Sequence, residues 1–391
     1  MMNDVTLNIE YTSLNKHQEE LCGDYIEVQS HQEDTKVIVL SDGLGSGVKA
    51  NILSTLSAKM ISTMLSKGVP IEECLDSIAH TLPICKVRGL AYSTFTILHI
   101  KPNQQLEIIN YDNPEVILLR DGKQKPLVHY TRILSDKRIT VSHVQLQEND
   151  VIIAMSDGCI HAGVGETLNY GWQHENIVSF LENMYIESYS AKALTKLLID
   201  ECNQLYKNKP GDDTTVLCLK VKKKEVINIL IGPPEDKHKD LEMLELFFSK
   251  KGKHIVCGGT TSQMVSKYLK KPLNLTLNYE DMALPPTASI EGVDLVTEGI
   301  LTISKLLEIA KDYTADNETF NTWLRKKDGA SMLAHTLFEE ATNINFFIGK
   351  AVNPAHQNPK LPINFSIKMQ LIETLINHLK TMHKEILVNY F

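Results

Sequence analysis

No apolar run in this 391-residue sequence approaches the roughly 20 residues that a membrane-spanning helix requires. Residues 1–16, MMNDVTLNIEYTSLNK, have neither a basic start nor an apolar core, which argues against a signal peptide. Lysine and arginine number 40 against 48 aspartates and glutamates, and the net charge of −8 disfavours a nucleic-acid-binding surface. These absences predict a cytoplasmic protein that binds neither membranes nor nucleic acid.

The cysteines are few, scattered and never spaced as CxxC. Their odd number disfavours a disulfide framework, and their spacing disfavours a zinc site. We therefore expect small buried hydrophobic side chains at these positions. They are Cys22, Cys74, Cys85, Cys159, Cys202, Cys218 and Cys257.

Many short strands are predicted in the first half of the chain, which favours antiparallel sheets. These segments are rich in β-branched residues and bounded by turn signals: Lys36–Leu40, Ser93–Ile100, Leu106–Asn110, Glu115–Arg120, Ile139–Leu146, Val151–Met155 and Thr214–Val221. Two helices are predicted between them. Gly47–Lys67 carries an apolar stripe at i, i+4 spacing from Ile52 to Met64, and Ser190–Tyr206 begins with a serine N-cap.

The charged run Lys222–Glu225 is interpreted as a linker between two domains, 1–222 and 226–391. Strands and helices alternate after it, which predicts an α/β domain. In order these are the strand Val226–Ile231, the helix His238–Lys251, the strand His254–Cys257, the helix Thr260–Lys270, the strand Val293–Val296 and the helix Ile300–Tyr313. Phe365–Leu387 is predicted to be one long amphipathic helix, either a homodimer seam or ordinary packing.

Acidic turns are the most distinctive feature of the first domain. Two apolar strands run directly into Ser-Asp-Gly, at Asp42 and at Asp157. Asp24 follows a glycine, and Gly211-Asp212-Asp213 precedes the last strand. Magnesium and manganese ions prefer carboxylate and carbonyl oxygens. A single Asp-Gly is an ordinary turn, but the repeated pattern predicts a divalent-cation site.

The segments GDYIEV, VIVLSDGLGSGVKA, VIIAMSDG and GDDTTVLCLKV occur in this order between about residues 20 and 222. This order resembles the SpoIIE/RsbU-type branch of the PP2C metal-dependent protein phosphatases, a bacterial signalling family. The resemblance implies an α+β fold, in which a sandwich of antiparallel sheets is flanked by helices. It also implies hydrolysis of phosphoserine or phosphothreonine by water that two Mn²⁺ or Mg²⁺ ions activate.

The resemblance also implies roles for individual residues. Asp42 would bridge the two ions, and the carbonyl of Gly43 would complete the second site. Asp157 and Asp212 would hold the first ion, and Asp24 would orient bound water. Asp213 is an alternative to Asp212. The sequence has no CxxxxxR loop, which agrees with a mechanism that needs no phosphoenzyme.

The glycine-rich segment after Asp42 enters a predicted helix. Ser46 and Gly47 would present backbone amides to a phosphate, and Lys49 would offer a charge. The alternative is a simple N-cap by Ser46. Eukaryotic relatives carry a histidine two residues after the bridging aspartate, where this chain has Leu44, so the general acid is unassigned.

The resemblance implies a phosphorylated protein substrate, such as an anti-sigma antagonist, and gating by an attached domain. Two other functions remain open: a catalytically silent signalling adaptor, and a phosphatase of a small metabolite.

Glycine-rich turns follow several strands of the second domain. Gly258, Gly259, Thr260 and Thr261 open a helix, and Glu298 lies in a similar turn. Such turns from successive parallel strands favour a small-ligand site. The alternative is a tight turn capped by a threonine.

Overall fold

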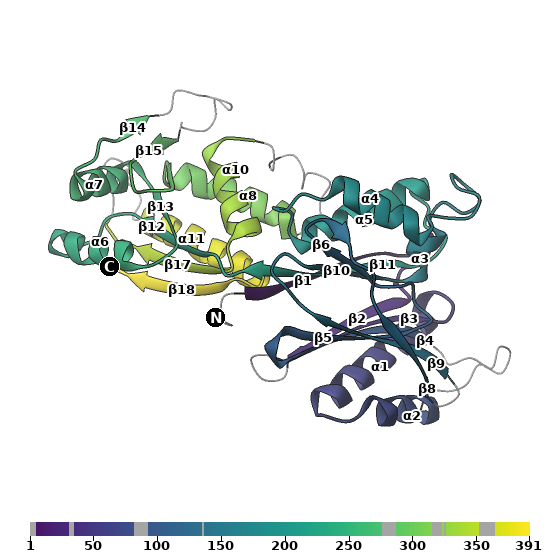
Figure 1. The fold of residues 1–391 in the computed structure, drawn as a ribbon. Helices are drawn as coiled ribbons and strands as arrows, with labels where there is room; N and C mark the ends of the chain where they lie inside the picture. Colours follow the sequence, from purple (N-terminus) through teal and green to yellow (C-terminus); the bar gives the residue numbers. More distant parts are fainter. Residues whose placement is uncertain are drawn as a thin grey trace. The chain divides into compact units, whose positions relative to one another are not determined.

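The computed structural model describes residues 5–30, 35–81, 93–134, 137–275, 287–314, 323, 326–351 and 364–391 (Figure 1). The chain forms two compact units, residues 1–223 and 224–391. No helix of the described ranges is both long and apolar enough to cross a membrane. Cys85 lies outside the described residues, and the other six cysteines are free, all of them buried except the half-buried Cys22.

Unit 1 contains two antiparallel sheets with helices, as expected. One sheet has the strand order β1 (Val5–Leu14), β11 (Thr214–Lys223), β10 (Val151–Met155), β6 (Ile117–Arg120) and β7 (Lys123–Gln124). The other has the order β2 (Asp24–Ser30), β3 (Lys36–Gly43), β4 (Ser93–Lys101), β5 (Gln105–Tyr111), β9 (Lys137–Gln145) and β8 (His129–Leu134). The helices are α1 (Gly47–Ser66), α2 (Ile71–Thr81), α3 (Asp157–His161), α4 (His174–Met184) and α5 (Ala191–Leu205).

The strand β3 explains why its sequence is apolar without interruption. Successive side chains of a strand point to opposite faces. Ile38 and Leu40 belong to a core between the two sheets, and Val37 and Val39 to a second core beneath α1 and α2. A strand covered on both faces cannot alternate apolar and polar residues, so the four-residue run marks a sandwich strand.

The predicted range of α1 is confirmed, but only the second half of its apolar stripe, Met60 and Met64, packs against the core. Ile52 and Leu56 are 51% and 45% exposed. The face against the sheet begins with small residues, including Ala50, Ser54 and Ser57, and continues with the aliphatic residues Ile61 and Leu65. Small side chains let the helix lie close to β3, and the hydroxyl of Ser54 donates to the carbonyl of Asn51. In the first half of α1, the close approach of the helix to the sheet therefore matters more than burial of the larger side chains of Ile52 and Leu56.

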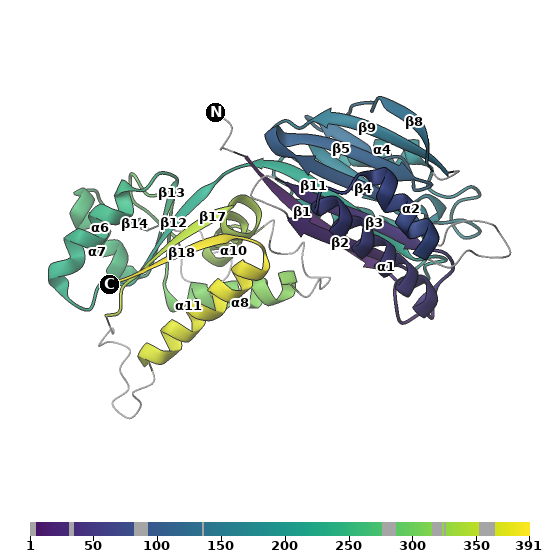
Figure 2. The same cartoon turned by 90° about the horizontal axis from the view of Figure 1, so that it is seen from below.

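Unit 2 is a sheet of parallel strands extended by two short antiparallel ones. Its order is β14 (Asn274–Leu275), β15 (Ala288–Ser289), β16 (Leu295–Thr297), β13 (Lys253–Cys257), β12 (Val226–Ile231), β17 (Asn343–Ile348) and β18 (Glu385–Tyr390). The helices are α6 (Asp240–Ser249), α7 (Gly259–Leu269), α8 (Ile300–Thr314), α10 (Gly329–Ala334) and α11 (Asn364–Thr381). Figure 2 shows α6 and α7 on one side of this sheet and α8 and α11 on the other.

The predicted single helix Phe365–Leu387 is wrong in its last part. The helix α11 ends at Thr381, His383 has a left-handed φ of 58°, and β18 then pairs with β17 in parallel. The side chain of Lys384 donates to the carbonyl of Phe338 at 2.7 Å. Pairing with β17 satisfies the backbone hydrogen-bonding groups of β18. The helical spacing of the apolar residues gave no sign of this pairing.

Candidate metal centre

The five candidate aspartates come from four chain segments at strand ends. Asp24 begins β2 and lies opposite Asp42, near the end of β3. Asp157 follows β10 after Ser156 and is the first residue of α3, and Asp212 and Asp213 directly precede β11. Since β10 pairs with β11 and β2 with β3, each sheet contributes two neighbouring segments.

Two glycines permit these segments to approach one another. A Cβ atom on Gly43 would lie 2.1 Å from the carbonyl oxygen of Ala50, in the first turn of α1. A Cβ atom on Gly158 would lie 2.2 Å from the carbonyl oxygen of Asp213. The glycine after each Ser-Asp is therefore required by close packing as well as by the turn.

Asp42 lies among the other four carboxyl groups. Burial raises the pKa of Asp42 to about 9, and repulsion from Asp24, Asp157, Asp212 and Asp213 adds to this shift. A carboxyl group responds in this way when like charges surround it in a poorly hydrated site. The structure thus brings together the five aspartates that the sequence analysis selected.

Two of the neighbours show the same effect. Burial raises the pKa of Asp24 to about 7, against the opposing influence of the Ser156 and Thr215 hydroxyls. Burial, followed by repulsion from Asp212, raises the pKa of Asp157, which also shares a hydrogen bond with Asp42.

Buried carboxylate oxygens at this site lack hydrogen-bond partners of normal geometry among the described residues. They are both oxygens of Asp24 and Oδ2 of Asp213. The nearby Ser156 hydroxyl accepts the backbone N–H of Thr215 at 2.8 Å, and the Thr215 hydroxyl pairs with Ser13 at 2.8 Å. A buried carboxylate without a partner is costly unless it is protonated or a cation balances it.

The two adjacent aspartates have different surroundings. Asp213 is 4% exposed, and its Oδ1 accepts the backbone N–H of Lys16 at 3.0 Å. The Asp212 side chain is 39% exposed, and its Oδ1 lies 3.7 Å from the ammonium of Lys16. Asp212 therefore faces the open side of the cluster, whereas Asp213 is engaged with the backbone.

Two basic side chains that were not predicted from the sequence lie at the border of the aspartate cluster. One is Lys16, which follows β1, and the other is His161, whose Nε2 lies 3.9 Å from Oδ2 of Asp157. The position of His161 one helical turn after Asp157 was a usable signal. Lys16 belongs to no motif, and only the pairing of β1 with β11 brings it to Asp212.

The proposed anion site at the start of α1 already faces a carboxylate. The Ser46 hydroxyl donates to Oε1 of Glu19 at 3.1 Å and makes no cap bond to the helix. A Cβ atom on Gly47 would lie 2.4 Å from Oε2 of Glu19. Lys49 is exposed. The negative charge that a helix N-terminus favours is thus supplied here by Glu19.

The candidate ligand residues of unit 2 make structural bonds. Oε2 of Glu298 accepts the N–H of Leu301 at 3.0 Å, which caps α8. Thr261 is buried, and its hydroxyl accepts the N–H of Gly232 at 3.0 Å. The exposed Gly259 and Thr260 begin α7 after Gly258, whose φ is +114°.

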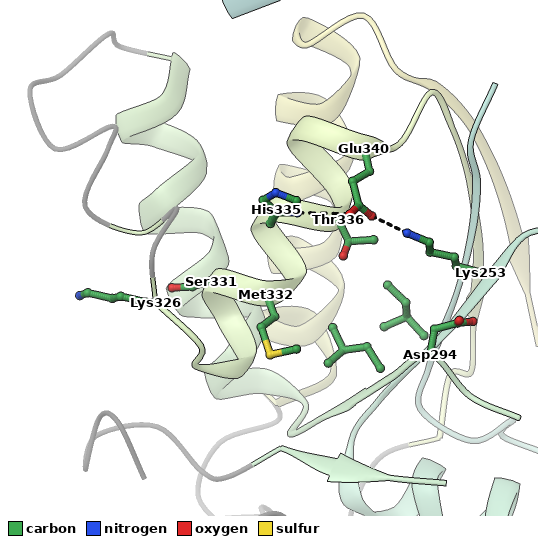
Figure 3. A pocket seen from close by; sticks show the side chains of 10 residues that line it. Lys253, Asp294, Lys326, Ser331, Met332, His335, Thr336 and Glu340 are labelled. Carbon is green, nitrogen blue, oxygen red and sulfur yellow. Dashed lines mark hydrogen bonds and ion pairs between the residues drawn. The ribbon is translucent and has the colours of Figure 1, made fainter. Parts of the chain in front are cut away.

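None of those residues lines the unit 2 cavity shown in Figure 3, which has a volume of about 350 Å³. Its charged wall is an ion-pair network, in which Glu340 lies 2.7 Å from Lys253 and 3.4 Å from His335. Glu340 keeps a low pKa of about 2, first through its hydrogen bond with His335. These charges satisfy one another, which is the behaviour of a structural network.

Within the described ranges, no three histidine, cysteine, aspartate or glutamate side chains are grouped tightly enough to hold an ion as they stand. Mutual repulsion among carboxylates opposes a tighter grouping. The donors present nevertheless suit a hard divalent cation, because all are oxygens and several are buried without a partner.

Comparison with solved structures finds PP2C-type phosphatase domains. The phosphatase domain of the cell fate determinant SpoIIE from Bacillus subtilis is 17% identical, covering 56% of this chain and 94% of that chain, with a TM-score of 0.44. The RsbU and RsbW domains of Rv1364c from Mycobacterium tuberculosis are 19% identical, covering 56% and 60%, with a TM-score of 0.43. RsbX in complex with magnesium is 18% identical, covering 55% and 96%, with a TM-score of 0.39.

No curated protein matches the sequence significantly. The family model of Stage II sporulation protein E (SpoIIE) matches residues 32–222, a little less than half of the chain. This range contains the strand ends that carry Asp42, Asp157 and Asp212. Over residues 32–222 the chain therefore matches the SpoIIE family, and unit 1 is similar to PP2C-type phosphatase domains.

Proposed function

We propose that unit 1 hydrolyses phosphoserine or phosphothreonine on a signalling protein, in a reaction that depends on Mn²⁺ or Mg²⁺. The observation that carries this proposal is the burial of Asp24 and Asp42 among three further carboxyl groups. Such a cluster is costly unless its carboxyl groups are protonated or cations balance them, and bound cations would let all five ionise.

Asp42, Asp157 and Asp212 would hold the ions, together with the carbonyl of Gly43. Asp24 would orient bound water, and the backbone bond from Lys16 would keep Asp213 behind Asp212. Divalent cations bound there would supply Lewis-acid activation of water and neutralisation of phosphoryl charge.

Lys16 would receive the phosphoryl oxygens. Its ammonium is half exposed at the open side of the cluster, next to Asp212, so it can reach a substrate without unfolding. The carboxylate of Glu19 at the start of α1 would repel a second anion, which favours the side of Lys16 for the phosphoryl group.

Regulation would act through α1. This helix begins four residues after Gly43, and Gly43 touches the backbone of its first turn, so a shift of α1 would move Asp42. In this proposal unit 2 gates the phosphatase, and the substrate is a small phosphoprotein such as an anti-sigma antagonist.

The test is hydrolysis of p-nitrophenyl phosphate, phosphoserine and phosphothreonine peptides, and a panel of phosphorylated metabolites. Turnover of the peptides that needs Mn²⁺ or Mg²⁺, and that is lost in Asp42→Asn but kept in the exposed Asp112→Asn, supports the proposal. Faster turnover of a metabolite would identify a small-molecule phosphatase instead. An unmodified protein that is inactive with every divalent ion would identify a silent adaptor.

A further inference from the structure

The strand order of unit 2 reverses between β12 and β17. The parallel strands run in the order β16-β13-β12-β17-β18, so chain connections leave β12 and β17 in opposite directions. Ligands of doubly wound sheets bind beyond the carboxyl ends of the strands at such a point. Here those ends are Ile231, followed by Gly232, and Ile348, followed by Gly349.

A lysine of α11 places its ammonium at this point. Nζ of Lys368 donates to the carbonyl oxygen of Gly349 at 2.7 Å. A Cβ atom on Gly232 would lie only 2.2 Å from the same Nζ, so any side chain there would displace the ammonium. Gly349 is equally constrained, because its Cβ atom would lie 2.0 Å from the carbonyl oxygen of Pro233. Gly232 and Gly349 thus leave the space in which the ammonium of Lys368 lies.

The charge of Lys368 has no acidic partner among the described residues. Burial lowers the pKa of Lys368 to about 8, and no carboxylate within the described ranges opposes this effect. Burying an ammonium without a counter-charge costs free energy. If the only role of Lys368 were its hydrogen bond to the carbonyl of Gly349, a neutral donor would serve at a lower cost. The arrangement is therefore better explained by an anion that joins the site.

The surroundings of the ammonium suit a phosphoryl group. The N–H of Gly232 donates to the Thr261 hydroxyl at 3.0 Å, which ties the first turn of α7 to the β12 turn. Lys350 follows Gly349, and its Nζ lies 5.2 Å from the ring centre of Tyr390, which adds positive charge at the same edge. The backbone N–H groups of Gly232 and Gly349 already donate to Thr261 and Ile231, so the lysine charge rather than backbone donors would hold a compact dianion here.

We propose that unit 2 binds the phosphoryl group of a small molecule at the carboxyl ends of β12 and β17, with Lys368 as its counter-charge. The source is either a nucleotide or free phosphate. The inference concerns binding by unit 2 and does not depend on hydrolysis by unit 1.

Calorimetric titration of the full chain in EDTA tests the proposal, because chelation prevents metal-assisted binding at the aspartate cluster. The probes are inorganic phosphate, AMP, ADP and ATP. We expect at least one to bind with a Kd below about 5 mM. Lys368→Met should weaken that binding at least tenfold, and Lys380→Met, an exposed position on the same helix, should leave it unchanged. Tighter binding of nucleotides than of phosphate would identify a nucleotide site, and equal binding a phosphate site.

A second measurement needs no variant. An amine-acylating reagent followed by peptide mass spectrometry should label Lys368 in the unmodified protein, and the bound probe should slow this labelling at least threefold while Lys380 stays unaffected. No binding by any probe, equal binding by Lys368→Met, or labelling of Lys368 that the probe does not slow would each overturn the proposal.

Discussion

Replacing Asp42 by asparagine should abolish phosphatase activity and, without metal, make unit 1 more stable. The activity should fall at least about 100-fold, because the residue that would bridge the ions is lost. The gain in stability has a separate cause. An asparagine keeps the shape of the side chain but has no carboxyl group to bury, which is the main cause of the raised pKa of Asp42, and none to be repelled by its neighbours.

The size of the gain follows from the pKa of Asp42. Its ordinary value is 3.8 and its value in the folded protein is about 9, so the folded state holds the proton more tightly than the unfolded state. The stability contributed by this group is therefore greatest below pH 4 and is lost as the pH rises toward 9. Each pH unit in this window costs about 1.4 kcal/mol, which amounts to about 4 kcal/mol at pH 7.

Tryptophan fluorescence can measure this effect because each unit has one buried tryptophan, Trp172 in unit 1 and Trp323 in unit 2. In a Trp323→Phe background, urea unfolding in EDTA would report unit 1 alone. The difference between Asp42→Asn and its parent should grow by about 3 kcal/mol between pH 5 and pH 7. Adding Mn²⁺ should stabilise the parent and leave Asp42→Asn nearly unchanged.

The exposed Asp112→Asn is the matched control and should show no pH-dependent difference. A metal-free Asp42→Asn protein that is less stable than its parent at pH 7 would refute the reasoning. Such a result would mean that the contacts of the Asp42 carboxyl group stabilise the folded protein rather than destabilise it.

Three further substitutions probe other parts of the protein. Lys16→Met should raise KM for a phosphopeptide about tenfold with little change in kcat, and Lys16→Arg should restore it; a fall in kcat alone would contradict phosphoryl binding. Asp150→Ala should destabilise unit 1 by about 3 kcal/mol in urea unfolding, because fully buried Asp150 accepts two 2.8 Å bonds from Arg120; a loss below 1 kcal/mol would argue against this. Thr261→Val should cost unit 2 about 1–3 kcal/mol, measured through Trp323, because the Gly232 N–H loses its acceptor; the exposed Thr260→Val should cost little.

The sandwich strands and the aspartates could be selected from the sequence for a common reason. The residues of β3 and β10 are apolar on both faces because both faces are covered, and each run ends at Ser-Asp-Gly. The candidate carboxylates are therefore marked by the abrupt change from buried strand to turn. The serine N-cap of α5 was equally visible, and Ser190 accepts the N–H of Ala193 at 3.1 Å.

Other features had no local signature. The first half of the buried face of α1 is made of glycine, alanine and serine, so the exposed Ile52 and Leu56 indicated the helix but not its orientation. The strand β18 is read as helix because its residues continue the apolar pattern of α11, and only the free edge of β17 favours the extended form.

The sequence alone determined which side chains are candidates for the chemistry, because strand ends and Asp-Gly turns are set by neighbours a few residues away. The tertiary structure decided their environment. Lys16 meets Asp212 through strand pairing over nearly 200 positions, Glu19 meets the start of α1, and Lys368 reaches two distant glycine turns. Contacts of this kind depend on which surfaces pack together, and that is fixed by burial over the whole domain rather than by any single segment.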